Sequence, residues 1–132
     1  IQQHKNHPTL GACVAELAAA HEAVSGTAMR LLMWFQSGRM QMVPLAANRF
    51  LEMMSVLSVG WLLLHGAVIA GEKEAALPAE GSGPDRAFYK GKHHAAVYFA
   101  KHILPEVKSH ADVLGREDRS ALDIPNDAFA TV

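Results

Sequence analysis

The clearest structural signal in the sequence is the stretch FLEMMSVLSVGWLLLHGAV, which spans residues 50–68. Large apolar side chains recur in it at alternating spacings of four and three residues. They are Phe50, Met54, Leu57, Trp61, Leu64 and Val68. Such spacing follows the 3.6-residue turn of an α-helix and places these side chains on one face. We therefore expect a long helix from about residue 44 to residue 70, with this face directed to the core.

The opposite face of the same helix is polar at its beginning and apolar further on. Asn48, Glu52 and Ser55 give the first part water-compatible groups. The second part lacks such polar groups and contains Val59, Leu62, Leu63 and Gly66. Because large exposed apolar patches usually mark interaction sites, we predict that these four positions form an interface that another protein surface covers.

A membrane-spanning helix is the alternative interpretation of this region. The segment 53–71 is apolar for about the ~20 residues that cross a bilayer. Serine, glycine and histidine dilute it, however, and no basic cluster flanks either end to orient it. A helix that is apolar all round is equally typical of one covered by protein. We therefore expect a core helix and no membrane span.

A second apolar stripe of helical period runs from Leu10 to Phe35 and is broken only at His21. It predicts a first helix over about residues 9–37, which Gly38 ends. The short link that follows makes the next helix return antiparallel beside the first.

Glycine and proline are dense between residues 71 and 85, which predicts an exposed loop. A third helix is expected from Asp85, a suitable N-cap. Pro105 lacks an amide and clashes with the carbonyl of Lys101, so this helix should kink or split into a short fourth one that ends near Gly115. The sequence thus predicts an all-α fold, an antiparallel bundle of three long helices in a single domain. Its core spans about residues 9–115, and residues 116–132 form a polar tail.

The composition excludes several classes of function. The 132 residues are 50% hydrophobic and carry a net charge of −1, so no basic field attracts nucleic acid. The single cysteine, Cys13, cannot form an internal disulfide, and the N-terminus shows no secretory signal. We expect a cytoplasmic, globular protein.

The usual patterns of catalytic and metal sites are missing from the sequence. The eight histidines do not share one helix face at the spacings that zinc or di-metal sites need. Glu106 and His110 are four residues apart, a pair interpreted as a solvated contact. Cys13 lies beside the apolar stripe of the first helix and is expected to behave as a small hydrophobe. No phosphate-cradling loop or nucleophile motif occurs. The sequence therefore predicts no catalytic, cofactor-binding or metal-ligating residue.

His21 and His65 are the two histidines with apolar sequence surroundings. They could meet inside the bundle, where a buried histidine can relay protons. The simpler interpretation is that each is a neutral core histidine bonded to one partner. They also support an alternative function, an independent helical bundle that binds a small apolar ligand or haem through one of them.

Two blocks of sequence carry a family resemblance. The first is LAANRFLEMMSVLSVGWLLL, residues 45–64, with its Gly-Trp pair. The second is FYKGK at residues 88–92, followed by AAVYFA at residues 95–100 and by Leu104 and Pro105. The segment SALD at residues 120–123, before Phe129, is similar to the closing segment of the same module. Over roughly residues 9–129 the chain resembles the C-terminal helical domain of bacterial acyl-CoA dehydrogenases, including the methylthio-propionyl-CoA dehydrogenase-like branch.

The resemblance implies a parent flavoenzyme of fatty acid metabolism, which oxidises an acyl-CoA thioester between its α and β carbons with FAD and a carboxylate base. In that family the flavin domain and the base lie N-terminal to this module, so no catalytic residue carries over. The implied role is a structural and interaction domain. Its expected partners are the acyl-CoA dehydrogenase core domains or a second copy of this chain.

Overall fold

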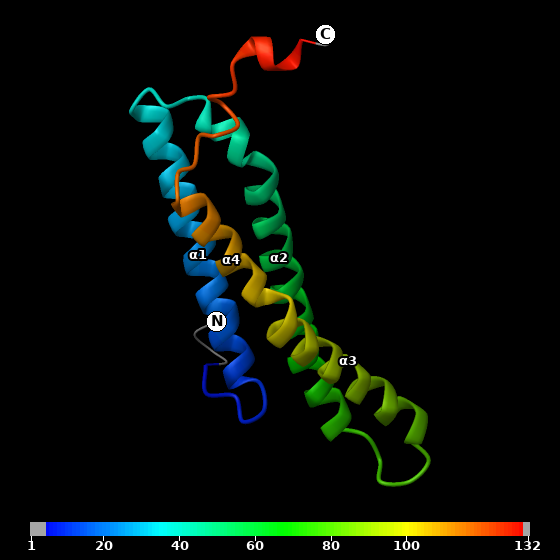
Figure 1. Cartoon of the computed structure of the whole chain (residues 1–132). Helices are drawn as coiled ribbons and strands as arrows, with labels where there is room; N and C mark the ends of the chain where they lie inside the picture. Colours follow the sequence, from blue (N-terminus) through cyan, green and yellow to red (C-terminus); the bar gives the residue numbers. More distant parts are fainter. Residues whose placement is uncertain (1–4, 131–132) are drawn as a thin grey trace.

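The structure is a computed structural model that describes residues 5–130, and its regular elements are all helices, with no strand in that range. They are α1 (Gly11–Gln36), α2 (Met42–Ala75), α3 (Gly83–His102), α4 (Leu104–Gly115) and the 3-10 helix η2 (Asn126–Phe129). α1 and α2 are antiparallel neighbours, and α3 and α4 return along them (Figure 1). The predicted all-α antiparallel bundle is confirmed.

The face of α2 that is buried differs from the predicted one. Small residues dominate it, with larger side chains only at intervals. Its members are Met42, Ala46, Met53, Gly60, Leu64, Ala67 and Ala70. Ala96 and Ala100 of α3 are also fully buried. Where helix backbones approach closely only small side chains fit, so the core face of α2 is turned toward its alanines and glycine. Of the predicted stripe only Leu64 is buried, whereas Met54 and Trp61 are exposed.

Gly60 marks a very close approach in this core. A Cβ built on it would lie 2.8 Å from the Cδ2 atom of Leu104 in α4. Leu104 is itself buried, as is Val107 one turn later. The start of α4 is therefore packed directly onto the backbone of α2.

The third predicted helix is split, as expected. α3 ends at His102, Ile103 has φ −108° and ψ −46°, and α4 begins at Leu104 with Pro105 in its first turn. Proline is tolerated there because the amide it lacks has no intrahelical partner in a first turn. The bend lets α3 pack mainly on α2 while α4 packs on both α1 and α2.

The loop between α2 and α3 is shorter than predicted. α2 continues past Gly71 to Ala75, because the residues that follow Gly71 include glutamate, lysine and alanine, which favour helix. α3 begins at Gly83, so Asp85 lies within its first turn, and the prediction that Asp85 is the N-cap is wrong. Its carboxylate still suits the positive end of the helix dipole.

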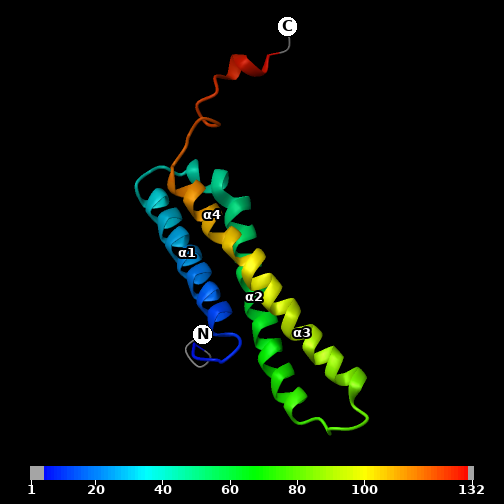
Figure 2. The same ribbon diagram turned by 60° about the horizontal axis from the view of Figure 1, so that its bottom comes forward.

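The α2–α3 hairpin extends past the beginning of α1 (Figure 2). α2 has 34 residues and α1 has 26, a difference of about 12 Å at roughly 1.5 Å per residue. The last turns of α2 therefore have α3 as their neighbour and lack cover from α1.

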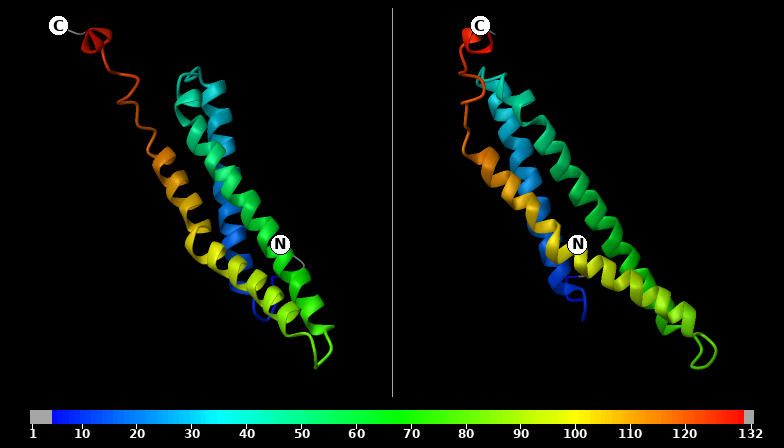
Figure 3. Two further views of the ribbon diagram at one scale, coloured as in Figure 1. Left: turned by 90° about the vertical axis from the view of Figure 1, so that its right-hand side faces the viewer. Right: turned by 45° about the vertical axis from the view of Figure 1, so that its right-hand side comes forward.

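The tail leaves the bundle at the opposite end. Leu122 packs against a second cluster formed by Trp34, Met42 and Ala46. Beyond it the chain turns outward, and η2 stands clear of the helices (Figure 3). Phe129, in η2, is 71% exposed.

Candidate interaction surface

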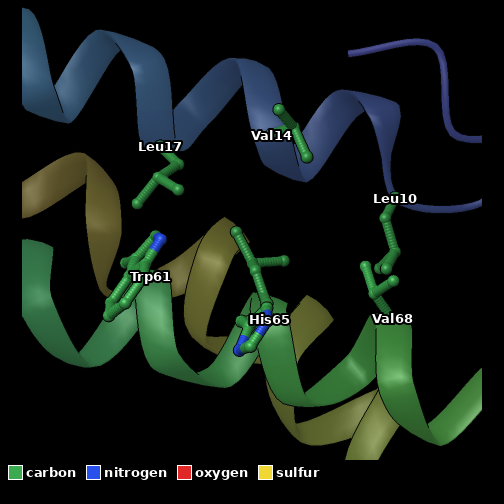
Figure 4. Close-up of a pocket in the computed structure, with 7 residues that line it drawn as sticks. Leu10, Val14, Leu17, Trp61, His65 and Val68 are labelled. Carbon is green, nitrogen blue, oxygen red and sulfur yellow. The ribbon is translucent and has the colours of Figure 1, made fainter. Parts of the chain in front are cut away.

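A small hollow between α1 and α2, here called the α1–α2 groove, is formed mostly by aliphatic side chains. Its members are Leu10, Val14, Leu17, Trp61, Leu64, His65 and Val68. Trp61 and His65 lie along α2 opposite the α1 side chains (Figure 4). Their rings are stacked, with centroids 6.0 Å apart and planes 5° apart. The cavity measures about 50 Å³, which is room for a few water molecules.

Both histidines singled out in the sequence border this side of the bundle, but neither is buried. His65 lines the α1–α2 groove, and His21 lies beside Leu17 and Trp61 in an adjoining hollow. Both side chains are exposed. The interpretation of these residues as core histidines is therefore wrong, because the face of α2 that contacts the core is turned away from His65.

A second hollow, the Phe88 groove, lies between the last turns of α2 and the beginning of α3. Its walls are apolar and two lysines stand at it. The residues are Leu62, Leu63, Gly66, Ile69, Ala70, Lys73, Phe88, Tyr89 and Lys92. The groove measures about 300 Å³, and the Nζ atom of Lys92 lies 5.2 Å from the centroid of the Phe88 ring.

The predicted interface residues lie in or beside the Phe88 groove. Leu62, Leu63 and Gly66 line it. Val59 and Leu62 are exposed, whereas Leu63 is half-buried. The apolar continuation expected for this face of α2 is therefore accessible, and its role as an interface stays a prediction.

The exposed apolar surface is broader than the four predicted residues. Large exposed side chains follow α2 over most of its length, and we call them the outer face of α2. They are Leu51, Met54, Val59, Trp61, Leu62 and Ile69. Trp61 and Leu62 lie at its middle and are 53% and 57% exposed. By length and composition α2 is apolar enough to cross a membrane, and 28% of its most apolar stretch is buried. The core helices of soluble proteins can have the same length and composition.

Trp61 and Phe88 are surface residues that sequence reasoning missed, because Trp61 was placed on the core face and Phe88 was given no surface role. The polar residues near Trp61 on the helix are the signal that could have placed it on the surface. Ser58 and His65 lie three and four residues away on the same helix side. Phe88 is 59% exposed and lies near the beginning of α3, in the part of the hairpin that extends past α1.

A cluster of charged side chains, Arg30, Arg39 and Glu117, joins the tail to the bundle, and we call it the Glu117 clasp. Arg30 of α1 donates a hydrogen bond of 2.9 Å to the Glu117 carboxylate, and Arg39 pairs with the other oxygen. Glu117 has φ +53°, which a non-glycine residue adopts only at a cost. The hydrogen bond from Arg39 is the largest cause that lowers the pKa of Glu117, and the hydrogen bond from Arg30 adds to it. The buried indole N–H of Trp34 lies near this carboxylate without reaching hydrogen-bond geometry.

The remaining candidates for chemistry are dispersed. Cys13 is buried, as expected, and this burial raises the pKa of its thiol. His110 contacts Glu52 at 3.5 Å and Arg49 at 3.0 Å, so it links α4 to α2. Within residues 5–130, no three histidine, cysteine, aspartate or glutamate side chains are grouped to hold a metal ion.

Comparisons with known proteins place this bundle. Residues 1–125 match the family model described as acetyl-CoA dehydrogenase C-terminal like. The broad-specificity linear acyl-CoA dehydrogenase FadE5 of Mycobacterium tuberculosis is 34% identical over 120 residues, which cover 87% of this chain and 19% of that protein. Butyryl-CoA dehydrogenase of Syntrophomonas wolfei is 35% identical over 89 residues, which cover 67% of this chain and 14% of that protein.

The matched region is thus about a fifth or less of each relative's length. Together with the helical architecture, the family match over residues 1–125 identifies the kind of domain, and the chain belongs to the C-terminal domain family of acyl-CoA dehydrogenases.

Proposed function

We propose that this chain is the non-catalytic C-terminal structural and interaction domain of a cytoplasmic acyl-CoA dehydrogenase-type flavoenzyme. The parent reaction would be the α,β-dehydrogenation of an acyl-CoA thioester, carried out with FAD by other domains. The observation that carries the proposal is the exposed apolar outer face of α2 on a chain that matches only a fifth or less of its relatives.

The hollow between α1 and α4, about 470 Å³, does not fit FAD. Its walls are made of small residues such as Ala23, Gly26 and Ala111, with Arg30, Asp112 and Arg116 beside them. They offer no aromatic or large apolar side chain on which a flavin ring could stack, whereas cofactor sites are mostly lined by such side chains. We therefore assign flavin binding to the other domains of the parent enzyme.

The outer face of α2 is the surface that we assign to docking on those core domains. Burying one exposed leucine, valine or isoleucine contributes about 1.5–3 kcal/mol before the costs of association. Exposed side chains of this size follow α2 from Leu51 to Ile69. Such a face would be costly in water, and its burial supplies a driving force for docking.

Haem or small-ligand binding at His21 or His65 is less well supported. The hollow beside His65 measures only about 50 Å³, far below the size of usual cofactor pockets of roughly 300–1,000 Å³. His65 stacks on Trp61. A colourless purified chain is the expected result, and a bound Soret or flavin absorbance band would contradict the non-catalytic assignment.

The test of docking compares two glutamate substitutions on α2. Val59 lies on the outer face and outside the Phe88 groove, and Ser55 is an exposed polar position on the same helix. The binding partner is an acyl-CoA dehydrogenase from the same organism, produced without its matched C-terminal region. We expect Val59→Glu to weaken binding at least tenfold, about 1.4 kcal/mol, because it buries a charge. Ser55→Glu should leave binding nearly unchanged, and equal effects would contradict the proposed docking face.

A further inference from the structure

We infer that the acidic C-terminal segment of one copy, residues 123–130, docks in the Phe88 groove of a second copy. This inference deepens the proposed function, because it assigns a partner to one part of the surface described above. It starts from two exposed features, the tail and the groove. The tail lies at one end of the bundle, and the α2–α3 hairpin, whose helices line the groove, lies at the other (Figure 1).

The tail has the composition of a docking segment. Ile124 is 43% exposed and Phe129 is 71% exposed, so its two large apolar side chains have little cover from their own chain. Asp123 and Asp127 are acidic, and residues 120–130 contain no lysine or arginine. The segment therefore offers apolar anchors together with negative charge.

The Phe88 groove offers the complementary surface. Leu62, Ile69 and Phe88 provide apolar walls, and Lys73 and Lys92 stand at the groove. Between Arg86 and Pro105 the chain carries no acidic residue. Aromatic side chains in pockets, flanked by charged pairs, are the usual anchors of a protein interface. Phe129 can thus enter the groove while Asp127 approaches a lysine.

The tail cannot reach the groove of its own chain. Leu122 is packed on Trp34 and Met42, at the beginning of α2. Ile69 of the groove lies about 40 Å from Met42 along α2, at roughly 1.5 Å per residue. From Leu122 to Phe129 even a fully extended chain spans only about 25 Å. The Glu117 clasp and Leu122 hold the tail at its end of the bundle, so the groove it fills belongs to another molecule.

When two copies lie side by side and antiparallel, the tail of each copy can enter the Phe88 groove of the other. The tail end of each bundle then lies next to the groove end of the other. This arrangement has twofold symmetry and is closed, which is the commonest form of soluble homo-oligomers. The tail is exchanged reciprocally, and no further copy is recruited.

Disulfide trapping between two differently tagged chains tests the exchange. Both chains carry Cys13→Ala, one also carries Phe129→Cys, and the other carries Phe88→Cys. Cysteines bridge only when their Cα atoms come within about 4.4–6.8 Å. We expect the Phe129→Cys and Phe88→Cys chains to form a mixed disulfide at least tenfold faster than Phe129→Cys with Ala28→Cys, an exposed control position on α1. Equal rates, or a wild-type chain that stays monomeric at high micromolar concentration, would overturn the inference.

Charge reversal tests the contact between tail and groove independently of cysteine chemistry. Lys92→Glu alone and Asp127→Lys alone should each weaken the dimer measured by analytical ultracentrifugation by several-fold. Mixing the two variants should restore much of the affinity, because the reversed charges meet between chains. Absence of any recovery would count against the pairing. Neither experiment contains the flavoenzyme core, so failure here leaves the proposed docking on that core intact.

Discussion

Gly60 shows how a single residue fixes the packing of this bundle. Its missing side chain leaves the space that Leu104 fills, and a Cβ there would meet three atoms of Leu104 within 3.2 Å. Gly71 lies on the same helix with nothing within 4 Å of such a Cβ. Both glycines weaken the helix by roughly 1 kcal/mol relative to alanine. They differ only in whether the fold needs the space.

Alanine substitutions at these two glycines should therefore have opposite signs. Gly71→Ala should raise the free energy of unfolding by up to about 1 kcal/mol through helix propensity. Gly60→Ala should lower it by about 1 kcal/mol, because overpacking costs roughly 1–3 kcal/mol and exceeds the same gain. Urea denaturation of both variants measures the difference. Stabilisation of equal size at both positions would show that α4 does not approach α2 as described.

Glu117 links stability to pH through its clasp. Its pKa is lowered, chiefly by the hydrogen bond from Arg39, so the ionised form is favoured in the folded state. A group with a lowered folded pKa stabilises the fold fully above its unfolded pKa of about 4.3, and this contribution is lost as the pH falls through the folded value. Glu117→Gln should therefore be less stable than wild type at pH 7.

The same difference should shrink as the pH falls below about 5 and vanish below the folded pKa of Glu117. Thermal unfolding across pH 3–7 measures it. Glu80→Gln in the α2–α3 loop is the matched control, because none of the ion pairs found within residues 5–130 involves Glu80. A pH-independent gap between wild type and Glu117→Gln would disprove the clasp.

For the individual helices, the sequence predicted their positions along the chain but not which face of α2 is buried in the core. Periodic spacing predicted the three long helices, and the chemistry of Pro105 predicted the break near it, because each depends on local sequence. The rotation of α2 depends instead on where α3 and α4 approach it, and large side chains were a poor guide to that. Gly60, Ala67 and Ala70 carry little hydrophobic weight, yet they lie at the contacts. Of the candidate surface, the apolar part after Ser55 was predicted, and Trp61 and Phe88 were not.

The position of the core face of α2 can be measured with two substitutions. Met53 is fully buried, whereas Trp61 is the larger side chain and half exposed. Met53→Ala should lower the free energy of unfolding by about 2–5 kcal/mol, as buried methionines usually do. Trp61→Ala should cost less, about 1 kcal/mol, when dilute protein is unfolded in urea. A larger cost for Trp61→Ala would restore the face that spacing alone predicted.

For the whole molecule, the arrangement of helices leaves one long side of α2 without cover. α3 and α4 pack on one side of the α1–α2 pair, and the outer face of α2 retains its apolar side chains in solvent. The helix arrangement and the exposed apolar surface together support the proposal that this domain docks on another domain. The central claim is therefore that Trp61, exposed in the separate chain, becomes buried on the flavoenzyme core.

Fluorescence quenching of Trp61 tests this claim most directly. Trp34 is only 1% exposed, and replacing it with phenylalanine leaves Trp61 as the sole tryptophan of the chain. The core domains should be produced with a non-fluorescent tryptophan analogue, so that the signal belongs to Trp61. We predict strong acrylamide quenching in the separate chain, clear protection when the core domains are added, and no protection by phosphatidylcholine vesicles. Quenching that stays unchanged in a complex proven by sedimentation, or protection by the vesicles alone, would contradict the account.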